Sequence, residues 1–278
     1  MSLQGFVCPL NGTNVGLGAC VTCPSPCTEL PILFALLQSD RKVSKDRFSV
    51  TESYKPPQVL ALERKHDYWV DPMKLVWQTF GTSWHAMIER QREAMAAYGR
   101  KDKEYTFEAA NHFECDFDVD GQKVIVHGTP DQYHHPSGML TDYKTLKYYW
   151  DVAYLMKGDW KSSHYGTQVN LYRYFEFPLC NNMQLVALVK DWNRKLAADK
   201  GVPPIVRFTV PRMKDKEIED DLRTALRDHL VAQDDITKVR PCTADERWKD
   251  SIRCEEYCPC NQFCRQYMEA RDEKGANA

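Results

Sequence analysis

The chain of 278 residues is long enough for one catalytic domain with appendages or for two small domains. Its 37 basic and 39 acidic residues leave a formal net charge of −2, which argues against a protein that coats nucleic acid non-specifically but allows a local basic surface. There is no run long enough for a membrane span and no start typical of a signal peptide, so we expect a cytoplasmic protein with no membrane partner.

The predicted elements begin with a Cys-rich N-terminal arm over residues 1–40. A helix is predicted over about residues 80–98, because apolar side chains recur there at helical spacing, and from Tyr105 onward a period of two predicts strands. The later elements are strands over 108–119, 123–127 and 139–145, a helix over 163–175, strands over 183–190 and 205–210, and a helix over 214–233. This order predicts an α/β or α+β fold, with a central mixed sheet flanked by helices over residues 49–238 and a Cys-rich tail over 239–278.

Two acidic residues and a lysine are expected to meet on one hairpin. Side chains alternate along a strand, so Asp142 and Lys144 face one side and Tyr143 faces the other. A turn at residues 136–138 would set Asp131 beside Asp142. Two converging carboxylates repel each other unless a cation lies between them, and Mg²⁺ or Mn²⁺ suits such oxygen ligands. That ion would clamp a scissile phosphate and lower the pKa of a bound water, while Lys144 would neutralise the developing charge or help orient the attacking water.

This Pro-Asp and Asp-x-Lys arrangement resembles the motif of the PD-(D/E)XK nucleases. Two further matches are similar to the RecB-like exonuclease branch, which includes CRISPR-associated and phage-encoded enzymes. One is His85, in Gly-Thr-Ser-Trp-His at the helix before the sheet, and the other is Gln168 with Tyr172 on the helix after the hairpin. The resemblance covers about residues 49–265 and implies a metal-dependent DNA exonuclease with a PD-(D/E)XK core.

The resemblance also implies roles for single residues. The ligands of Mg²⁺ or Mn²⁺ would be His85, Asp131, Asp142 and the backbone carbonyl of Tyr143. The catalytic set would be Asp131, Asp142, Lys144, Gln168 and Tyr172. Because Gln168 and Tyr172 share one helix face, they would contact the DNA backbone or support Lys144. Each motif taken alone has an ordinary interpretation, as a solvated ion pair, a histidine at a helix start or packing residues.

Five of the 11 cysteines lie in the tail, and close spacing in a reducing compartment favours metal ligands over disulfides. Cys254, Cys258 and Cys264 resemble the C-terminal cysteine group of RecB-like nucleases that carry an iron–sulfur cluster. Cys242 is the favoured fourth ligand, Cys260 is an alternative, and a cysteine of the N-terminal arm is a third choice. Thiolates suit a [4Fe–4S] cluster or Zn²⁺, and spacing alone does not separate the two.

Four cysteines of the arm form a second group within a stretch rich in Gly and Pro. They are Cys8, Cys20, Cys23 and Cys27. We consider two interpretations, a separate zinc site or second cluster, and ordinary thiols of a loop-rich segment. The isolated Cys115 and Cys180 are predicted to be small buried hydrophobic residues.

Basic and aromatic residues interleave over residues 144–195, which predicts a DNA partner that is single-stranded or has free ends. The chain lacks the motif G-x₄-G-K-[ST] of a helicase, so a helicase, recombinase or CRISPR protein is an expected partner.

Two other classes of protein are alternatives to an enzyme. The first is a non-catalytic iron–sulfur or zinc subunit of a DNA-processing complex, which would not need the intact Asp, Asp and Lys set. The second is a zinc-ribbon nucleic-acid-binding protein, which would not need the long middle region.

Overall fold

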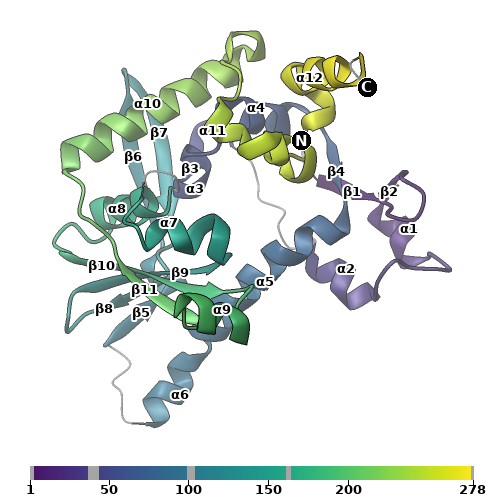
Figure 1. Ribbon diagram of the computed structural model, residues 1–278. Coiled ribbons are helices and arrows are strands. Elements are labelled where there is room, and N and C mark those ends of the chain that lie inside the picture. The colour runs from purple at the N-terminus through teal and green to yellow at the C-terminus, as the bar shows by residue number, and fades with distance from the viewer. Residues whose placement is uncertain (1–2, 37–43, 99–103, 161–163, 277–278) are drawn as a thin grey trace. The chain divides into compact units, whose positions relative to one another are not determined.

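The computed structural model describes residues 3–36, 44–98, 104–160 and 164–276 (Figure 1). The chain divides into two compact units. Unit 1 comprises residues 1–45, 55–79 and 224–278, and unit 2 comprises residues 46–54 and 80–223. The arm and the tail thus belong to the same unit, while the predicted domain boundaries at residues 40, 49 and 238 stay a prediction. No helix of the described ranges is both long and apolar enough to cross a membrane.

Unit 2 is built on a five-stranded sheet in the order β11-β10-β9-β8-β5. The strands are β5 (Tyr105–Phe107), β8 (Gln132–His134), β9 (Met139–Leu146), β10 (Asn182–Val189) and β11 (Ile205–Thr209). Strands β9 and β10 are parallel, and the other neighbouring pairs are antiparallel. The predicted mixed sheet with helices is therefore confirmed at the level of an α+β fold.

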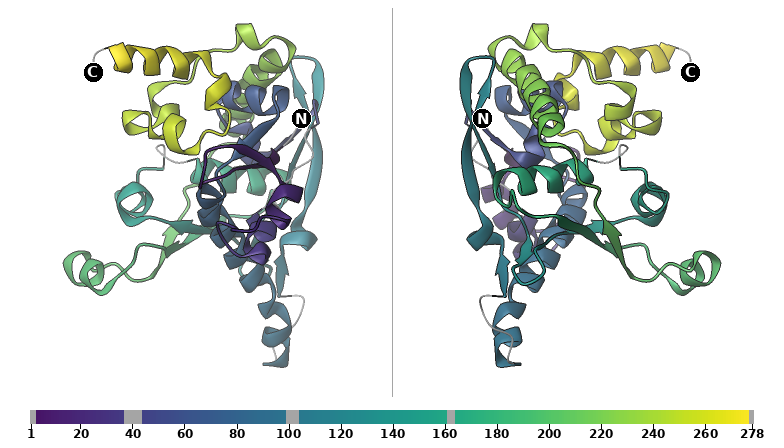
Figure 2. Two further views of the ribbon diagram at one scale, coloured as in Figure 1. Left: turned by 90° about the vertical axis from the view of Figure 1, so that its right-hand side faces the viewer. Right: turned by 90° about the vertical axis from the view of Figure 1, so that its left-hand side faces the viewer.

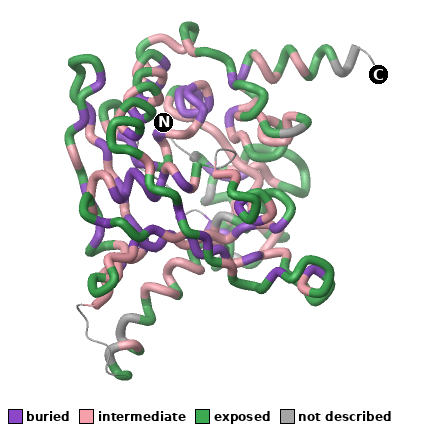
Figure 3. Tube along the Cα trace, turned by 60° about the vertical axis from the view of Figure 1, so that its left-hand side comes forward, coloured by how far each residue is buried: buried purple, intermediate pink, exposed green. Residues whose placement is uncertain are grey.

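The central strands of this sheet are buried because helices cover them. β10 is apolar along nearly its whole length, as expected for a strand with both faces covered, and Leu185 and Ala187 are fully buried. Parallel strands need a crossover connection, and here it contains a turn at Tyr148–Val152, α7 (Ala153–Leu155) and α8 (Tyr165–Phe175). Both helices lie on one side of the sheet in Figure 1, and buried segments run through the strands in Figure 3.

A second sheet of unit 2 has the order β3-β7-β6. Its strands are β3 (Arg47–Ser49), β6 (Phe113–Val119) and β7 (Gln122–Gly128), and β6 and β7 form the long twisted ribbon seen in Figure 2. The predicted Asp-Gly turn joins them, since Asp120 and Gly121 both have positive φ, at 54° and 90°. Alternate residues such as Val124 and Val126 are buried, so one face of the ribbon contributes to the core.

The strand predicted over residues 108–119 is wrong in its first part. The chain forms a single 3₁₀ turn at Glu108–Asn111 before β6 begins at Phe113. The buried side chain of Asn111 explains the break, because its amide donates to the backbone carbonyls of Thr106 and Pro130, each at 3.1 Å. These hydrogen bonds hold the turn by which the chain leaves the five-stranded sheet after β5 and enters the three-stranded sheet at β6. Glu108 is the first residue of this turn, so its position is fixed by the same bonds.

The helix predicted over residues 80–98 begins earlier and is divided. α5 spans Pro72–Glu89 and α6 spans Gln91–Ala97. The start at Pro72 follows from two local features, because proline suits the first helical position and the Asp71 carboxylate accepts a hydrogen bond from the backbone N–H of Met73 at 2.9 Å. The long helix α10 (Asp215–Asp234) agrees with its predicted range within one residue at each end.

Unit 1 contains a small sheet in the order β2-β1-β4 and several short helices. Its strands are β1 (Leu3–Val7), β2 (Asn14–Gly16) and β4 (Tyr68–Val70). Its helices include α1 (Leu17–Val21), α2 (Leu30–Leu36), α4 (Pro57–Lys65), α11 (Ala244–Arg247) and α12 (Arg265–Ala276). The tail between α11 and α12 consists of single turns at Lys249–Ser251, Arg253–Tyr257 and Asn261–Phe263. The remaining helices, α3 (Val50–Ser53) and α9 (Arg194–Lys200), belong to unit 2.

Candidate metal and catalytic site

The hairpin of β8 and β9 brings the predicted carboxylates together. Gly138 in the turn has a φ of +60°, and the register pairs Gln132 with Thr141, which sets the preceding Asp131 opposite Asp142. The backbone N–H of Tyr143 donates to Oδ2 of Asp131 at 2.6 Å and thereby fixes that carboxylate. The predicted juxtaposition is borne out by this register.

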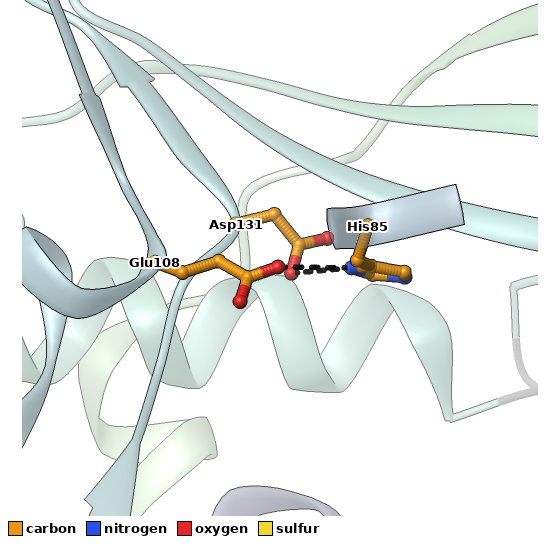
Figure 4. A group of neighbouring side chains, drawn as sticks. All are labelled: His85, Glu108 and Asp131. Atoms are coloured by element: carbon orange, nitrogen blue, oxygen red, sulfur yellow. Dashed lines mark hydrogen bonds and ion pairs between the residues drawn. The ribbon is translucent and has the colours of Figure 1, made fainter. Parts of the chain in front are cut away.

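Three side chains converge beside the hairpin (Figure 4): His85 from α5, Glu108 from the turn after β5 and Asp131 from the loop just before β8. Nδ1 of His85, on α5, lies 3.1 Å from Oδ1 of Asp131 and 3.6 Å from Oε1 of Glu108. One ligand atom of each residue lies within 4.8 Å of those of the other two, a spacing that could hold a metal ion. Two carboxylates and an imidazole are ligands that suit divalent ions such as Mn²⁺.

Glu108 was missed by the sequence prediction. It follows β5, and its backbone N–H donates to the carbonyl of Asp131 at 3.1 Å, so strand pairing sets it next to the predicted ligand. In the sequence it is one acidic residue among 39, separated from Asp131 by more than 20 positions. Only the β5–β8 register, which local patterns do not encode, would have identified it.

The electrostatics of this group depend on a positive charge at its centre. Burial by itself lowers the pKa of His85, but hydrogen bonds to Asp131 and Glu108 outweigh it and raise the pKa to about 10. The imidazole is therefore protonated at neutral pH in the metal-free protein, where it compensates the two carboxylates. A divalent cation would take over that role and displace the proton, because a histidine ligand must be neutral.

Asp142 and Lys144 form a buried ion pair next to these residues. Nζ of Lys144 lies 2.6 Å from Oδ2 of Asp142, whose side chain is only 1% exposed. Burial raises the pKa of Asp142, with the charge of Asp131 adding to it and Lys144 opposing. Burial alone would lower the pKa of Lys144, but the two carboxylates outweigh it and raise the value. Apart from the ion pair, the Asp142 carboxylate has no hydrogen-bond partner in the described part of the chain, which leaves it room for a cation.

Gln168 and Tyr172 share a helix face, as predicted, but they are buried. Nε2 of Gln168 donates to the hydroxyl of Tyr172 at 2.8 Å, and the two side chains are 8% and 6% exposed. The Tyr172 ring lies against Gly128 at the end of β7, where a Cβ would approach the ring to 2.8 Å. The glycine is therefore required by close packing. A contact of the pair with DNA or with Lys144 stays a prediction.

The connection after β9 presents aromatic side chains to solvent. We call residues 148–156 the aromatic turn. It is anchored at Tyr148, whose backbone N–H donates to Asp191 at 2.8 Å, and at Asp151, which accepts from the hydroxyl of Tyr165 at 3.4 Å. The exposed rings are Tyr149, Trp150 and Tyr154, at 64%, 56% and 47%. The aromatic turn thus directly follows β9, the strand that carries the ion pair.

In unit 1 four cysteines of the tail line one small pocket, which we call the thiol pocket. Its sulfur-bearing residues are Cys242, Cys254, Cys258 and Cys264, and α4 closes it with Gln58, Val59 and Leu62. Burial raises the pKa of Cys242 to about 12, and the charges of Glu246 and of the other three cysteines add to it. Thiolates gathered in this way repel one another unless a cation binds them.

Cys260 is placed differently from the other four tail cysteines. It is fully buried in an apolar cluster with Leu62 and Cys264, outside the lining of the thiol pocket. Cys242, in contrast, is held from two sides by Gln266: its backbone N–H donates to Oε1 of Gln266, and Nε2 of Gln266 donates to its carbonyl, both at 3.0 Å. The geometry thus favours Cys242 over Cys260 as the fourth member of the set.

The two isolated cysteines differ in burial. Cys180 is buried, as predicted, and its thiol donates to the carbonyls of Gly138 and Asn182, both at 3.2 Å. Cys115, on β6, shares the core-facing side of the ribbon with Phe113 and Phe117 but is only partly buried. The prediction of a buried Cys115 is therefore wrong.

The chain matches no known family model and no curated protein. Its structure is similar to a solved structure described as the crystal structure of SSO0001, with a TM-score of 0.50 and 13% sequence identity. The similarity covers 82% of this chain and 89% of that chain. At this identity the likeness concerns the fold alone.

Proposed function

We propose that the chain is a metal-dependent nuclease of the PD-(D/E)XK type, an exonuclease that hydrolyses phosphodiester bonds in DNA. The observation that carries this proposal is the convergence of Asp131, Asp142 and Lys144 on paired strands. A buried carboxylate without hydrogen-bond donors is costly unless a cation or a lysine compensates it. A non-catalytic subunit has no need of this arrangement.

The donor set fits a divalent ion. His85, Glu108 and Asp131 would hold Mg²⁺ or Mn²⁺, with Asp142 as a neighbouring oxygen donor, so Glu108 joins the predicted ligands. Such an ion supplies Lewis-acid activation of a phosphate and of a water at neutral pH. The backbone N–H of Tyr143 keeps Asp131 in place for this purpose. The backbone carbonyl of Tyr143 stays a predicted ligand of the metal ion.

Lys144 is the group that would stabilise the transition state. Its raised pKa keeps the ammonium charged at neutral pH, and part of its side chain, 20%, is exposed. In the free protein this charge is paired with Asp142. With a cation held by the carboxylates, the ammonium would be free to donate to a phosphate oxygen. A fixed positive charge stabilises such an oxygen most strongly in a site of low dielectric constant.

The aromatic turn supports single-stranded DNA ends as the substrate. Exposed rings offer stacking surfaces that every base can use, and Lys147 and Lys157 flank them in the sequence. Such a surface, directly after β9 in the chain, suits unpaired bases that lead to the scissile phosphate. A helicase, recombinase or CRISPR protein as a partner stays part of this proposal.

We further propose that Cys242, Cys254, Cys258 and Cys264 bind a [4Fe–4S] cluster, with Zn²⁺ as the alternative. The four residues line one pocket, and α4 provides its apolar wall. A cluster there would link the tail to α4 within unit 1, so its role would be structural.

Degradation of end-labelled DNA tests the proposed activity. The protein is incubated with single- and double-stranded substrates in Mg²⁺, Mn²⁺ or EDTA, alongside the Lys144→Ala variant. We expect metal-dependent shortening from the ends, faster on single strands, and none with EDTA. Equal cleavage by Lys144→Ala would refute the assignment of the site, and no cleavage by folded, metal-loaded protein on any DNA would favour the non-catalytic subunit.

A further inference from the structure

The N-terminal arm contains a ligand set that the proposed nuclease does not use. Residues 1–28 include no Asp, Glu, His, Lys or Arg, so the thiols of Cys8, Cys20, Cys23 and Cys27 are the strong metal ligands in this stretch. A metal bound by the arm alone would have a purely sulfur environment, the donor set of structural zinc sites of the Cys₄ type.

The fold of the arm brings these cysteines together from three local structures. Cys8 follows β1 and opens a tight turn, in which the backbone N–H of Gly12 donates to the Cys8 carbonyl at 2.8 Å. Cys20 lies in α1, and the N–H of Cys23, just beyond this helix, donates to the Cys20 carbonyl at 3.3 Å. Cys27 ends the Pro-Ser-Pro segment that follows.

Packing links three of the four cysteines to one another. Cys20 and Cys27 both pack against the buried cluster of the arm, and the backbone N–H of Cys23 donates to the Cys20 carbonyl at 3.3 Å. All four residues are partly exposed, so a metal ion can reach them, and none is in a disulfide. Thiols that repel one another as thiolates are stabilised together by a shared cation.

The apolar core of the arm is small. Among its described side chains the buried hydrophobic residues are Phe6, Leu33 and Leu36, packed with the partly buried Cys20 and Cys27. Segments this small usually need a disulfide or a metal to stay folded. Two of the four thiols already lie against this cluster, so a bound metal would lock β1, α1 and α2 onto one another.

We propose that Cys8, Cys20, Cys23 and Cys27 bind one structural Zn²⁺, separate from the thiol pocket of the tail. No three of these sulfurs lie mutually within 4.8 Å in the described arm. Zn–S bonds of about 2.3 Å in a tetrahedron set the sulfurs about 3.8 Å apart. Zinc binding therefore draws the thiols together and tightens the arm.

The test measures metal content in the full-length protein, purified without oxygen. We expect about one zinc per chain in addition to the metal of the tail. Cys23→Ser and Cys8→Ser should each lose this zinc while keeping the iron and the colour of the tail cluster. Cys115→Ser is the matched control, because it removes a partly exposed thiol of β6 and should leave both metals unchanged.

A second readout does not depend on what co-purifies. The metal-free arm is titrated with Co²⁺ in the full chain, and tetrahedral thiolate coordination is followed by its visible absorption; limited proteolysis then reports protection of residues 1–36. Loss of both signals in Cys23→Ser supports the proposal. Unchanged zinc in Cys8→Ser and Cys23→Ser, loss of iron in place of zinc, or disulfides among these cysteines under reducing conditions would each overturn it.

Discussion

The carboxylate site of unit 2 lies on paired strands, whereas the thiol pocket of unit 1 lies among single turns. Asp131 and Asp142 are fixed by the register of β8 with β9, and β9 is paired on its other side with β10. Cys254, Cys258 and Cys264 lie in or next to turns of three to five residues. Hydrogen-bonded strands keep their geometry when a metal leaves, whereas isolated turns have no neighbouring strand to hold them. We therefore expect metal loss to stop chemistry at the first site and to unfold structure at the second.

The largest effect is expected from Cys258→Ser. Metal that binds only the folded state adds its binding free energy to folding, on the order of 10 kcal/mol for structural zinc in small domains, so losing the cluster should unfold the tail. Anaerobic protein should be brown, with absorption near ~400 nm, and the variant should be colourless and melt at a lower temperature. Cys260→Ala keeps the pocket thiols and should keep the colour. Full metal content and an unchanged melting temperature in Cys258→Ser would contradict the proposal that Cys258 binds a structural cluster. Zinc without iron in the unmodified protein would show that the metal is zinc and not an iron–sulfur cluster.

Asp142→Asn should separate activity from stability in unit 2. We expect DNA cleavage to fall by about a thousandfold, as with Lys144→Ala, because a group that acts on the transition state is lost. Burial raises the pKa of Asp142 in the metal-free fold, so the folded state loses stability as the pH rises through that raised pKa. Asn carries no charge and should leave the melting temperature of metal-free protein at pH 7 unchanged or higher. A variant that unfolds would show that the ion pair supports the fold.

His85→Gln should alter the pH dependence of metal binding. With the pKa raised to about 10, His85 must release a proton to bind a cation at pH 7, so Mn²⁺ affinity should rise by up to about tenfold per pH unit. The variant should bind Mn²⁺ more weakly at pH 8.5, and its Mn²⁺ affinity should depend less on pH. It should also regain part of its activity at high Mn²⁺ concentration. Calorimetry between pH 6.5 and 8.5 measures the slope. If Mn²⁺ affinity depends on pH equally in the unmodified protein and in His85→Gln, His85 is not a metal ligand and has a structural role.

The smallest effect is expected from Trp150→Ala. Stacking of one base on one ring contributes about 1–3 kcal/mol, so single-stranded DNA should bind about tenfold more weakly, and duplex DNA should be nearly unaffected. Fluorescence anisotropy in the Asp142→Asn background avoids cleavage. Tyr98→Ala is the control, because Tyr98 is 90% exposed but directly follows α6, outside the aromatic turn. An equal loss for Tyr98→Ala, or none for Trp150→Ala, would remove the aromatic turn from the substrate path.

The hairpin could be predicted from sequence because its signals are local. The alternation around Asp142 and the turn at Gly138 both lie within a dozen residues and determine the register. Glu108 could not be predicted, since it joins the site through the pairing of β5 with β8 and through the hydrogen bonds of Asn111. The choice between Cys242 and Cys260 was also open, because spacing carries no information on which thiol faces a pocket and which faces an apolar cluster.

The double hydrogen bond between Gln266 and the backbone of Cys242 closes residues 242–266 into a ring. Within this ring Asp250 and Ser251 adopt positive φ values of 57° and 60°, and Asp250 is exposed, so this is where a protease would cut most readily. A cut there leaves both pieces joined through Gln266 and through the shared thiol pocket. The tail would then survive as a nicked but assembled element, released only when the proposed metal is removed.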